Sequence, residues 1–264
     1  MTTTIPTATP TPITPAQIWL VLRAEVGEGL RAVVREPAAL FFSVVMPVGF
    51  YVLFAGLFGG QANEGTGGLP VAATMLATYG TFGVISVMLL NPGIGVADDR
   101  NRGWLKVKKV SGTPLALTLL ARVVAAVPYA LGVLLAMSLV SLLMAGPVLG
   151  LGSWLALVGV LLVGGLPFAL LGMAVGFVTS STATTAVLNA ALFPMVIASG
   201  LWVPLEIMPG WVAAVARFLP TWHLSEIAAA QLTGAPVLGH VLALLLTTAV
   251  AAVLAGAAYR SLRV

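Results

Sequence analysis

The chain has 264 residues, of which 59% are hydrophobic and only 8% are charged, and its formal net charge is +4. Because a typical soluble domain has about 25% charged residues, this composition excludes an ordinary soluble protein and predicts an integral membrane protein. The sequence contains no cysteine, which excludes disulfides, thiol catalysis and cysteine-based metal or haem sites.

A helix needs about 20 apolar residues to cross the hydrocarbon layer of a bilayer, and apolar runs of this kind fill almost the whole chain. They are continuously apolar, whereas the strands of a transmembrane barrel would alternate in polarity. We therefore expect an all-α integral membrane protein with six transmembrane helices. The expected spans are approximately Ala38–Phe58, Pro70–Val96, Leu115–Met144, Gly150–Val178, Thr184–Val203 and Pro236–Tyr259. In the fourth span, Gly172 and Gly176 form a small-xxx-small pattern that permits close helix packing.

Basic residues predict the orientation of these spans. With six crossings, all 12 basic residues except Arg217 fall on one side of the membrane. The positive-inside rule places that side, and both termini, in the cytoplasm. The expected localisation is therefore the cell (plasma) membrane, as a multi-pass protein. No basic domain is left over to bind nucleic acid.

Two segments precede the first expected span. Residues 1–15 contain seven Thr and four Pro, a composition that cannot bury enough apolar surface to become ordered, so we expect a disordered tail. In residues 16–36, apolar residues recur at helical spacing beside charged ones such as Arg23 and Arg31. This pattern predicts an amphipathic helix along the inner membrane surface. The alternative is a cytosolic extension of the first span.

The segment 204–235, between the fifth and sixth spans, is too apolar for an ordinary loop and is broken by Pro209 and Pro220. Each piece is too short to cross a membrane, so we expect short re-entrant or interfacial helices in the outer leaflet. A plain interfacial loop is the alternative. The residues expected to form this external cap are Pro204, Glu206, Pro209, Trp211, Pro220, Trp222 and His223.

No motif indicates an enzyme. The sequence has neither a GxxxxGK[ST] nor a GxGxxG nucleotide motif, so this chain is not expected to bind a nucleotide. His223, Ser225 and Glu226 lie too close together on one helix to converge as a catalytic triad. Asp98 and Asp99 would project about 100° apart on a helix, which argues against a metal pair. We expect no catalytic residue, cofactor or metal site in this chain.

A cluster of charge stands out between Asp98 and Lys109, where seven of the 20 charged residues (12 basic plus 8 acidic) occur. The topology places it in the longest cytoplasmic loop. Ionisable residues near mid-membrane, which a proton- or sodium-coupled carrier would need, are lacking, since Arg122 and His240 lie near opposite membrane surfaces. Energy for transport is therefore expected from a partner that docks on the loop. The alternative, that the cluster only fixes topology, does not explain its acidic pair or Trp104.

Two stretches of sequence resemble one family. Ala97–Pro114, ADDRNRGWLKVKKVSGTP, is similar to the acidic-basic-Gly-x-Leu-to-Pro segment after the second span of type-2 ATP-binding-cassette (ABC-2) transporter permeases. Ser199–Trp211, SGLWVPLEIMPGW, and Phe218–Leu224, FLPTWHL, resemble the family's segment between spans five and six. The resemblance covers residues 16–264, and within the family the sequence looks more like the drug and natural-product exporters than the polysaccharide exporters.

The resemblance implies a half-transporter permease that pairs with an identical or homologous permease and binds two copies of a separate cytosolic ATPase, which holds ATP and Mg²⁺. Within a transmembrane domain of residues 37–264, it implies that residues 98–113 form a coupling loop seated in the ATPase. Residues 16–36 would be a connector helix, and spans two and five would line the pathway. The residues expected to couple to the ATPase are Asp98, Asp99, Arg100, Arg102, Gly103, Trp104, Leu105 and Lys106.

Docking of this kind has a simple physical basis. Charge would orient the loop on its partner, and Trp104, Leu105 and Val107 would be its apolar anchors. The expected function is ATP-driven export of an amphiphilic or hydrophobic compound (a drug, an antibiotic or a lipid-like molecule), because charge-free spans suit a cargo that enters from the bilayer. Export of lipid-linked glycans, a membrane-embedded enzyme and a non-transporting anchor or sensor are the alternatives. Membrane lipids are further expected partners.

Overall fold

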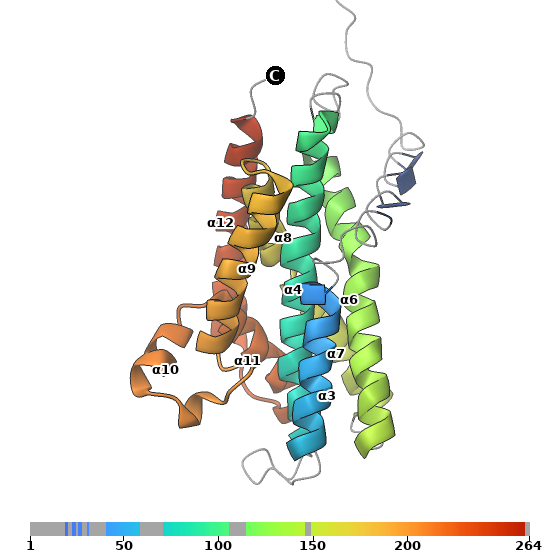
Figure 1. Cartoon of the computed structure of the whole chain (residues 1–264). Helices are drawn as coiled ribbons and strands as arrows, with labels where there is room; N and C mark the ends of the chain where they lie inside the picture. Colours follow the sequence, from blue (N-terminus) through green and yellow to red (C-terminus); the bar gives the residue numbers. More distant parts are fainter. Residues whose placement is uncertain are drawn as a thin grey trace, which may run out of the picture.

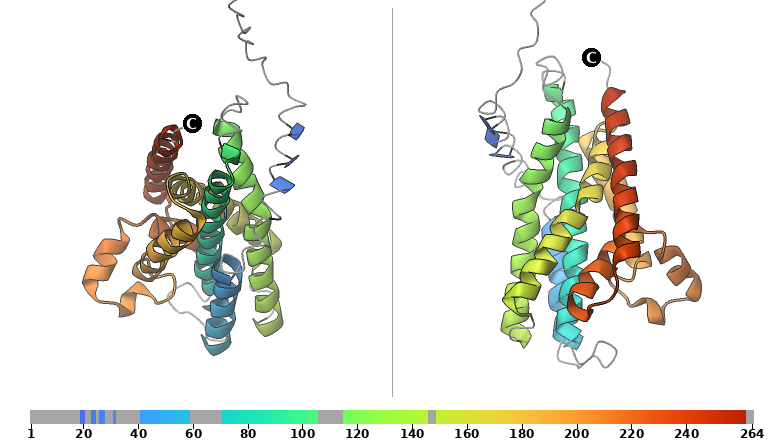
Figure 2. Two further views of the ribbon diagram at one scale, coloured as in Figure 1. Left: turned by 45° about the horizontal axis from the view of Figure 1, so that its top comes forward. Right: turned by 180° about the vertical axis from the view of Figure 1, so that it is seen from behind.

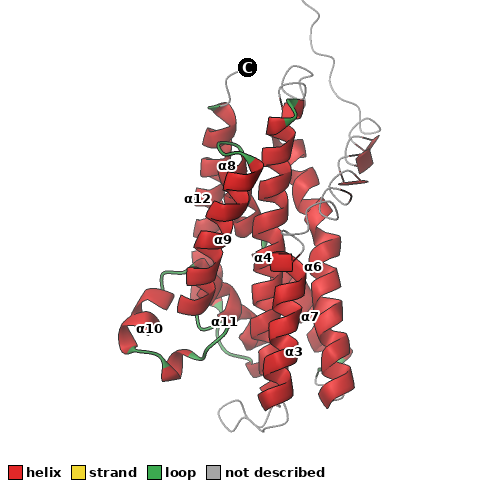
Figure 3. Ribbon diagram, viewed as in Figure 1, coloured by secondary structure: helices red, strands yellow, loops and turns green. Residues whose placement is uncertain are grey.

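The computed structural model describes residues 19–20, 23–24, 26–27, 31, 41–58, 71–105, 115–145 and 149–261. Within these ranges all regular structure is helical and no strand occurs (Figure 3). The all-α prediction is therefore confirmed. The predicted tail at residues 1–15 lies outside the described residues, as does most of the segment 16–36, whose few described residues are helical.

In the described part of the chain, six stretches of helix are long and apolar enough to cross a membrane, which confirms the predicted number of spans. α4 and α9 depart most from the predicted bounds: α4 continues through the acidic pair, and α9 begins at Ser181 because the preceding Ser180 caps it. The six stretches are η1 (Phe41–Val45) with α3 (Met46–Phe58), α4 (Val71–Asn101), α6 (Leu115–Ala145), α7 (Leu151–Gly164) with α8 (Leu166–Gly176), α9 (Ser181–Ala198) and α12 (Leu238–Arg260).

Helix α4 is the centre of the bundle (Figures 1 and 2). It contacts α3, α6, α7, α8, α9 and α11 (Pro220–Thr233), and every residue from Tyr79 to Ala97 is buried. The expectation that span two lines a pathway is therefore wrong for the middle of α4 in this conformation, because its neighbours cover it. In contrast, only 22% of α9 is buried, so span five does present a surface.

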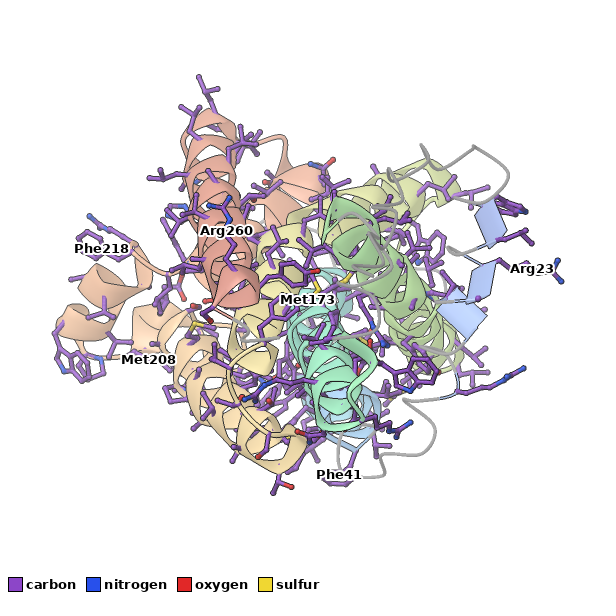
Figure 4. All side chains as sticks on the ribbon, turned by 90° about the horizontal axis from the view of Figure 1, so that it is seen from above. Arg23, Phe41, Met173, Met208, Phe218 and Arg260 are labelled. Carbon is purple, nitrogen blue, oxygen red and sulfur yellow. The ribbon has the colours of Figure 1, made fainter. Side chains whose placement is uncertain are left out.

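The closest packing in the bundle is between α4 and α8. A Cβ atom added at Gly172 would lie 2.0 Å from the carbonyl oxygen of Leu89, and one added at Gly176 would lie 2.1 Å from that of Gly93. No other residue type leaves room for the α4 backbone at these two positions, so the small-xxx-small pattern does serve close helix packing. Viewed along the bundle, Met173 of α8 lies near its middle (Figure 4).

The two ends of the bundle hold different groups of residues. The end of α4, the start of α9 and the end of α12 lie together, and we call this the Asp98 end (Figure 1). At the opposite end, where α3 ends and α7 begins, lies α11, and we call this the α11 end.

The predicted external segment forms η3 (Leu205–Ile207), α10 (Gly210–Ala216) and α11. The prolines start the helices as expected, since Pro209 is the N-cap of α10 and Pro220 is the first residue of α11. The two longer helices differ in their packing. α11 contacts α4, α7, α9 and α12, whereas α10 contacts η3 and α9 and extends away from the bundle (Figure 2).

Candidate coupling site at the Asp98 end

The charged cluster begins inside α4. The helix ends at Asn101, where the amide of Arg102 donates to the carbonyl oxygen of Asp98 at 2.9 Å and Gly103 adopts a φ of 77°. A left-handed residue just past the last helical turn is the usual way to stop a helix, and glycine adopts this conformation without a steric penalty. The loop after α4 therefore starts near Arg102, whereas the predicted coupling loop starts at Asp98.

Asp99 is buried and forms an ion pair with Arg122 of α6, through Oδ2 and Nη2. The two side chains are only 5% and 4% exposed. Space for the guanidinium comes from Gly95, one turn earlier on α4, where an added Cβ would lie 3.0 Å from Nη1 of Arg122. A buried ion pair of this kind links α4 to α6, because separating the charges would leave each one unpaired in a medium of low dielectric constant.

Asp98 points to a different helix. Its Oδ1 atom accepts a hydrogen bond from the hydroxyl of Ser181, the first residue of α9, and the side-chain amide of Asn101 donates to the same hydroxyl at 3.3 Å. The amide of Ala183 also donates to Oγ of Ser180 at 3.4 Å, which caps α9. A carboxylate at this position is favoured because the N-terminus of a helix carries partial positive charge.

The two adjacent carboxylates thus connect α4 to two neighbours. Successive side chains on a helix project about 100° apart, so Asp98 reaches α9 while Asp99 reaches α6. Both carboxylates are predicted from the sequence to lie in the docking surface, but the structure places both within the bundle. The role of Arg122 is not predicted from the sequence, which indicates only a residue near the membrane surface. A lone arginine inside a span, at the level of an acidic pair on the preceding span, was the available signal.

The outward surface of this end is formed by Arg100, Arg102 and Trp104, all exposed, with Trp104 at 50%. Leu105 is only 3% exposed and belongs to the hydrophobic core. Its expected role as an apolar anchor for the partner is therefore wrong, because the turn at Gly103 directs Trp104 outward and Leu105 inward. Lys106 and Val107 lie outside the described residues.

At the α11 end, His223 of α11 contacts His240 of α12, with their Nδ1 atoms 3.0 Å apart. Nε2 of His223 lies 3.0 Å from the carbonyl oxygen of Arg217, which can only accept, so Nε2 carries the proton. In the neutral pair, Nδ1 of His223 is consequently the acceptor and Nδ1 of His240 the donor. Trp222 packs against both imidazoles, with ring centroids 5.0 Å and 4.9 Å away.

Two groups in this cluster have shifted pKa values. Burial lowers the pKa of His223, and the nearby His240 lowers it further, while the hydrogen bond to the Arg217 carbonyl opposes the shift. Burial raises the pKa of Glu226; His240 lowers it in part, Glu206 raises it, and a hydrogen bond from Trp222 lowers it. The described residues contain no group of three or more side chains that could hold a metal ion.

The residues expected to form the external cap are divided between two surroundings. Pro220, Trp222 and His223 belong to α11, which is packed into the bundle, whereas Pro204, Glu206, Pro209 and Trp211 belong to the segment around η3 and α10. Trp211 is 69% exposed, and Phe218 at the end of this segment is 85% exposed and lies at the edge of the molecule (Figure 4). The segment predicted to form the cap thus consists of a packed helix, α11, and an exposed apolar part around η3 and α10.

Comparisons with known proteins agree with this architecture. Residues 17–233 match the family model described as ABC-2 type transporter, so the chain belongs to that family. One curated relative, "Putative transport permease YvfS" of Bacillus subtilis (strain 168), is 22% identical over 202 residues, which cover 75% of this chain and 79% of the relative. With its six spans, the chain is a multi-pass transmembrane permease of an ABC transporter, a class that works with an ABC ATPase.

Proposed function

We propose that this permease is an exporter subunit that pairs with a second permease and takes its energy from a separate cytosolic ATPase docked at the Asp98 end. The observation that carries the proposal is the arrangement of this end. Arg100, Arg102 and Trp104 are exposed there, at or just after the end of α4, and Asp98 and Asp99 tie this helix to its neighbours. ATP and Mg²⁺ belong to the partner in this proposal.

The arrangement suits the transmission of force. Exposed arginines can orient the partner electrostatically, and a half-exposed tryptophan can fill a pocket on it. A push on the end of α4 then moves α6 and α9 as well, because the buried Asp99–Arg122 pair and the Asp98–Ser181 hydrogen bond resist separation. Since α9 is the more exposed of the two spans first expected to line the pathway, its movement is the step proposed to change the cargo route.

The proposed cargo is an amphiphilic or hydrophobic compound that enters from the bilayer. The exposed side chains of α9 include Val187 and Ile197, and no charged residue occurs on this helix. A route along such a surface would desolvate a polar sugar without compensating it, so it favours an apolar cargo over a lipid-linked glycan. Transport assays with both cargo classes distinguish these alternatives.

The orientation follows from the charges at the two ends. The exposed basic residues Arg100, Arg102 and Arg260 share the Asp98 end, which is therefore proposed to face the cytoplasm. The chain has no cysteine, so single cysteines can report the topology. We expect labelling from inside at Asn101 and Ser261 and from outside at Gly234 and Asn63. Outside labelling of Asn101 would contradict the proposed orientation.

The central experiment is reconstitution of the permease with its ATPase in vesicles, with vanadate-sensitive ATP hydrolysis and cargo movement measured together. Arg102→Glu is expected to reduce ATPase recovery and transport without altering thermal unfolding, because Arg102 is exposed and its side chain faces outward. Arg260→Glu is the matched control, since Arg260 is an exposed arginine at the same end but on α12. Equal effects of the two changes would contradict a specific docking site, and hydrolysis without transport would favour the anchor or sensor alternative.

A further inference from the structure

The structure contains a pocket of about 410 Å³ between α7, α8, α11 and α12. Leu224 and Ile227 of α11 and Leu244 of α12 form its floor, and each is at most 7% exposed. Val163, Leu166 and Leu245 form the rim, and they are 67%, 36% and 60% exposed. The pocket therefore opens sideways from the bundle. Seen from behind, α7 and α12 stand on either side of this region (Figure 2).

The mouth of the pocket faces the interior of a membrane. Gly159 and Gly164 lie eight and thirteen residues after the start of α7, roughly 12–20 Å along the helix at 1.5 Å per residue. The hydrocarbon layer of a bilayer is about 30 Å thick, so this wall of the pocket lies near the middle of the bilayer. Hydrocarbon chains are thus the medium at its mouth.

The lining cannot hold a polar ligand. Thr248 has the one polar side chain among the lining residues, and its hydroxyl donates to the carbonyl oxygen of Leu244 at 2.7 Å. The rest of the wall is aliphatic, proline or glycine. Water has no partner in such a space, and apolar pockets stay dry and take apolar occupants. A headgroup or a sugar would lose its hydration without compensation.

The pocket is too small to enclose a helix of a second copy. One turn of helix about 10 Å across and 5.4 Å long has a volume of roughly 420 Å³, so a helix long enough to dock would not fit. A flexible acyl chain can enter such a space from the side. We propose that the pocket is a binding site for one acyl chain of a membrane phospholipid, held there as a bound lipid and not as cargo.

Three glycines of α7 meet different surroundings, and two of them make the proposal testable. At Gly164, an added Cβ would lie 2.2 Å from Cδ1 of Leu224, so this glycine allows α11 to pack against α7. At Gly159, which lines the pocket, an added Cβ would meet nothing within 4 Å, so a larger side chain can grow into the empty space. Gly152, two turns earlier on the same helix, also has nothing within 4 Å but does not line the pocket. It is the matched control.

The experiment uses the full chain in vesicles of phosphatidylethanolamine and phosphatidylglycerol that contain a trace of phospholipid with a diazirine in its acyl chain. After irradiation, adducts are mapped by mass spectrometry. We expect them to concentrate on the α7 and α12 peptides around Val163 and Leu245, above the equally exposed Leu139 and Leu143 of α6. Gly159→Phe should lower the pocket adducts several-fold, whereas Gly152→Phe should leave them unchanged.

Three outcomes would overturn the proposal: adducts in proportion to exposure alone, no effect of Gly159→Phe on a folded protein, or efficient cross-linking of two copies that carry Gly159→Cys. If the phenylalanine variant does not fold, Gly159→Leu, which fills less of the pocket, is used in its place. The adduct pattern of the wild type is an independent test of the site. Neither ATPase nor cargo is present in this experiment. Its failure would therefore leave the proposed export function untouched, and failure of that function would leave the lipid site untouched.

Discussion

The carboxylate of Asp99 on α4 is paired with the guanidinium of Arg122 on α6 in a buried ion pair at the Asp98 end. The pair joins the central helix of the bundle to the span that follows the charged loop. It accounts for an acidic residue in a segment that is otherwise rich in basic ones. Together with the contact between Asp98 and Ser181, it makes the end of α4 a junction of three spans.

Removing one partner of this pair should destabilise the fold strongly. Asp99→Asn leaves the buried Arg122 charge uncompensated, which typically costs about 3–5 kcal/mol. Thermal unfolding in detergent and the recovery of monodisperse protein measure the loss. Exchanging the charges, Asp99→Arg with Arg122→Asp, should restore part of the stability. The exposed Arg260→Gln should stay within about 0.5 kcal/mol of the wild type. If Asp99→Asn proved as stable as this control, the ion pair would not hold the helices.

Adjacent residues at the turn after α4 should respond in opposite ways to the same change. Leu105→Asp places a charge in the core and should reduce the yield of folded protein, because Leu105 is 3% exposed. Trp104→Asp changes a side chain that is 50% exposed, so the fold should survive while recovery of the ATPase falls. Membrane level, thermal unfolding and ATPase co-purification separate the two effects. Normal folding of Leu105→Asp with lost docking would restore Leu105 as a docking anchor.

The histidine pair at the α11 end should make local stability depend on pH. The folded state lowers the pKa of His223 below its ordinary value of 6.5, so the unfolded state binds more protons below that pH. The stability contribution of His223 is thus complete above about pH 6.5 and is lost as the pH falls through its lowered pKa. Protonation of Nδ1 of His223 would also place two N–H groups face to face. The hydrogen-exchange protection factors of α11, which are corrected for the intrinsic exchange rate at each pH, should therefore fall on acidification.

Other charges near this pair require a control. Glu226 has a raised pKa, so as the pH falls towards its ordinary value of 4.5 it contributes with the opposite sign. His240, Glu206 and Arg217 are the remaining neighbours that titrate or carry charge. His223→Gln removes the one titration under test and should flatten the response of α11 between pH 8 and pH 5. An unchanged response in this variant would assign the pH dependence to another group.

Asn91, in the middle of α4, is 8% exposed, and neither its amide nitrogen nor its amide oxygen has a hydrogen-bond partner among the residues that the structure describes. Leaving such a group unsatisfied costs about 1–3 kcal/mol, so Asn91→Leu, which is close in size, should maintain or increase thermal stability. A stability gain accompanied by a loss of transport would indicate that the amide serves function. A clear loss of stability would show that, in the membrane, the Asn91 amide forms a hydrogen bond with a partner outside this chain.

Much of this fold could be predicted from the sequence because hydrophobic length and charge placement determine membrane topology directly. The six spans, the breaks at Pro209 and Pro220 and the polar segment before α9 all follow from local chemistry. The direction of a side chain after a turn does not follow from local chemistry. Leu105 lies in the core and Trp104 on the surface because of the left-handed turn at Gly103, and no local pattern distinguishes these apolar neighbours.

Contacts between segments that are far apart in the chain also could not be predicted from the sequence. The pairing of Asp99 with Arg122, and of His223 with His240, depends on how helices rotate against each other. The burial of α4 depends on its central position, and hydropathy does not reveal it, since α4 and the far more exposed α9 have similar hydropathy. In a membrane, hydrophobicity does not separate a central helix from a peripheral one, because both lipid and protein are apolar.

The most direct test of docking at the Asp98 end is site-specific photo-crosslinking in cells. A p-benzoylphenylalanine residue in place of Trp104 should capture a protein with a nucleotide-binding phosphate loop. The same residue in place of Phe218, which is 85% exposed but belongs to the other part of the molecule, should not. Capture of that ATPase from position 218 and not from position 104 would contradict the account.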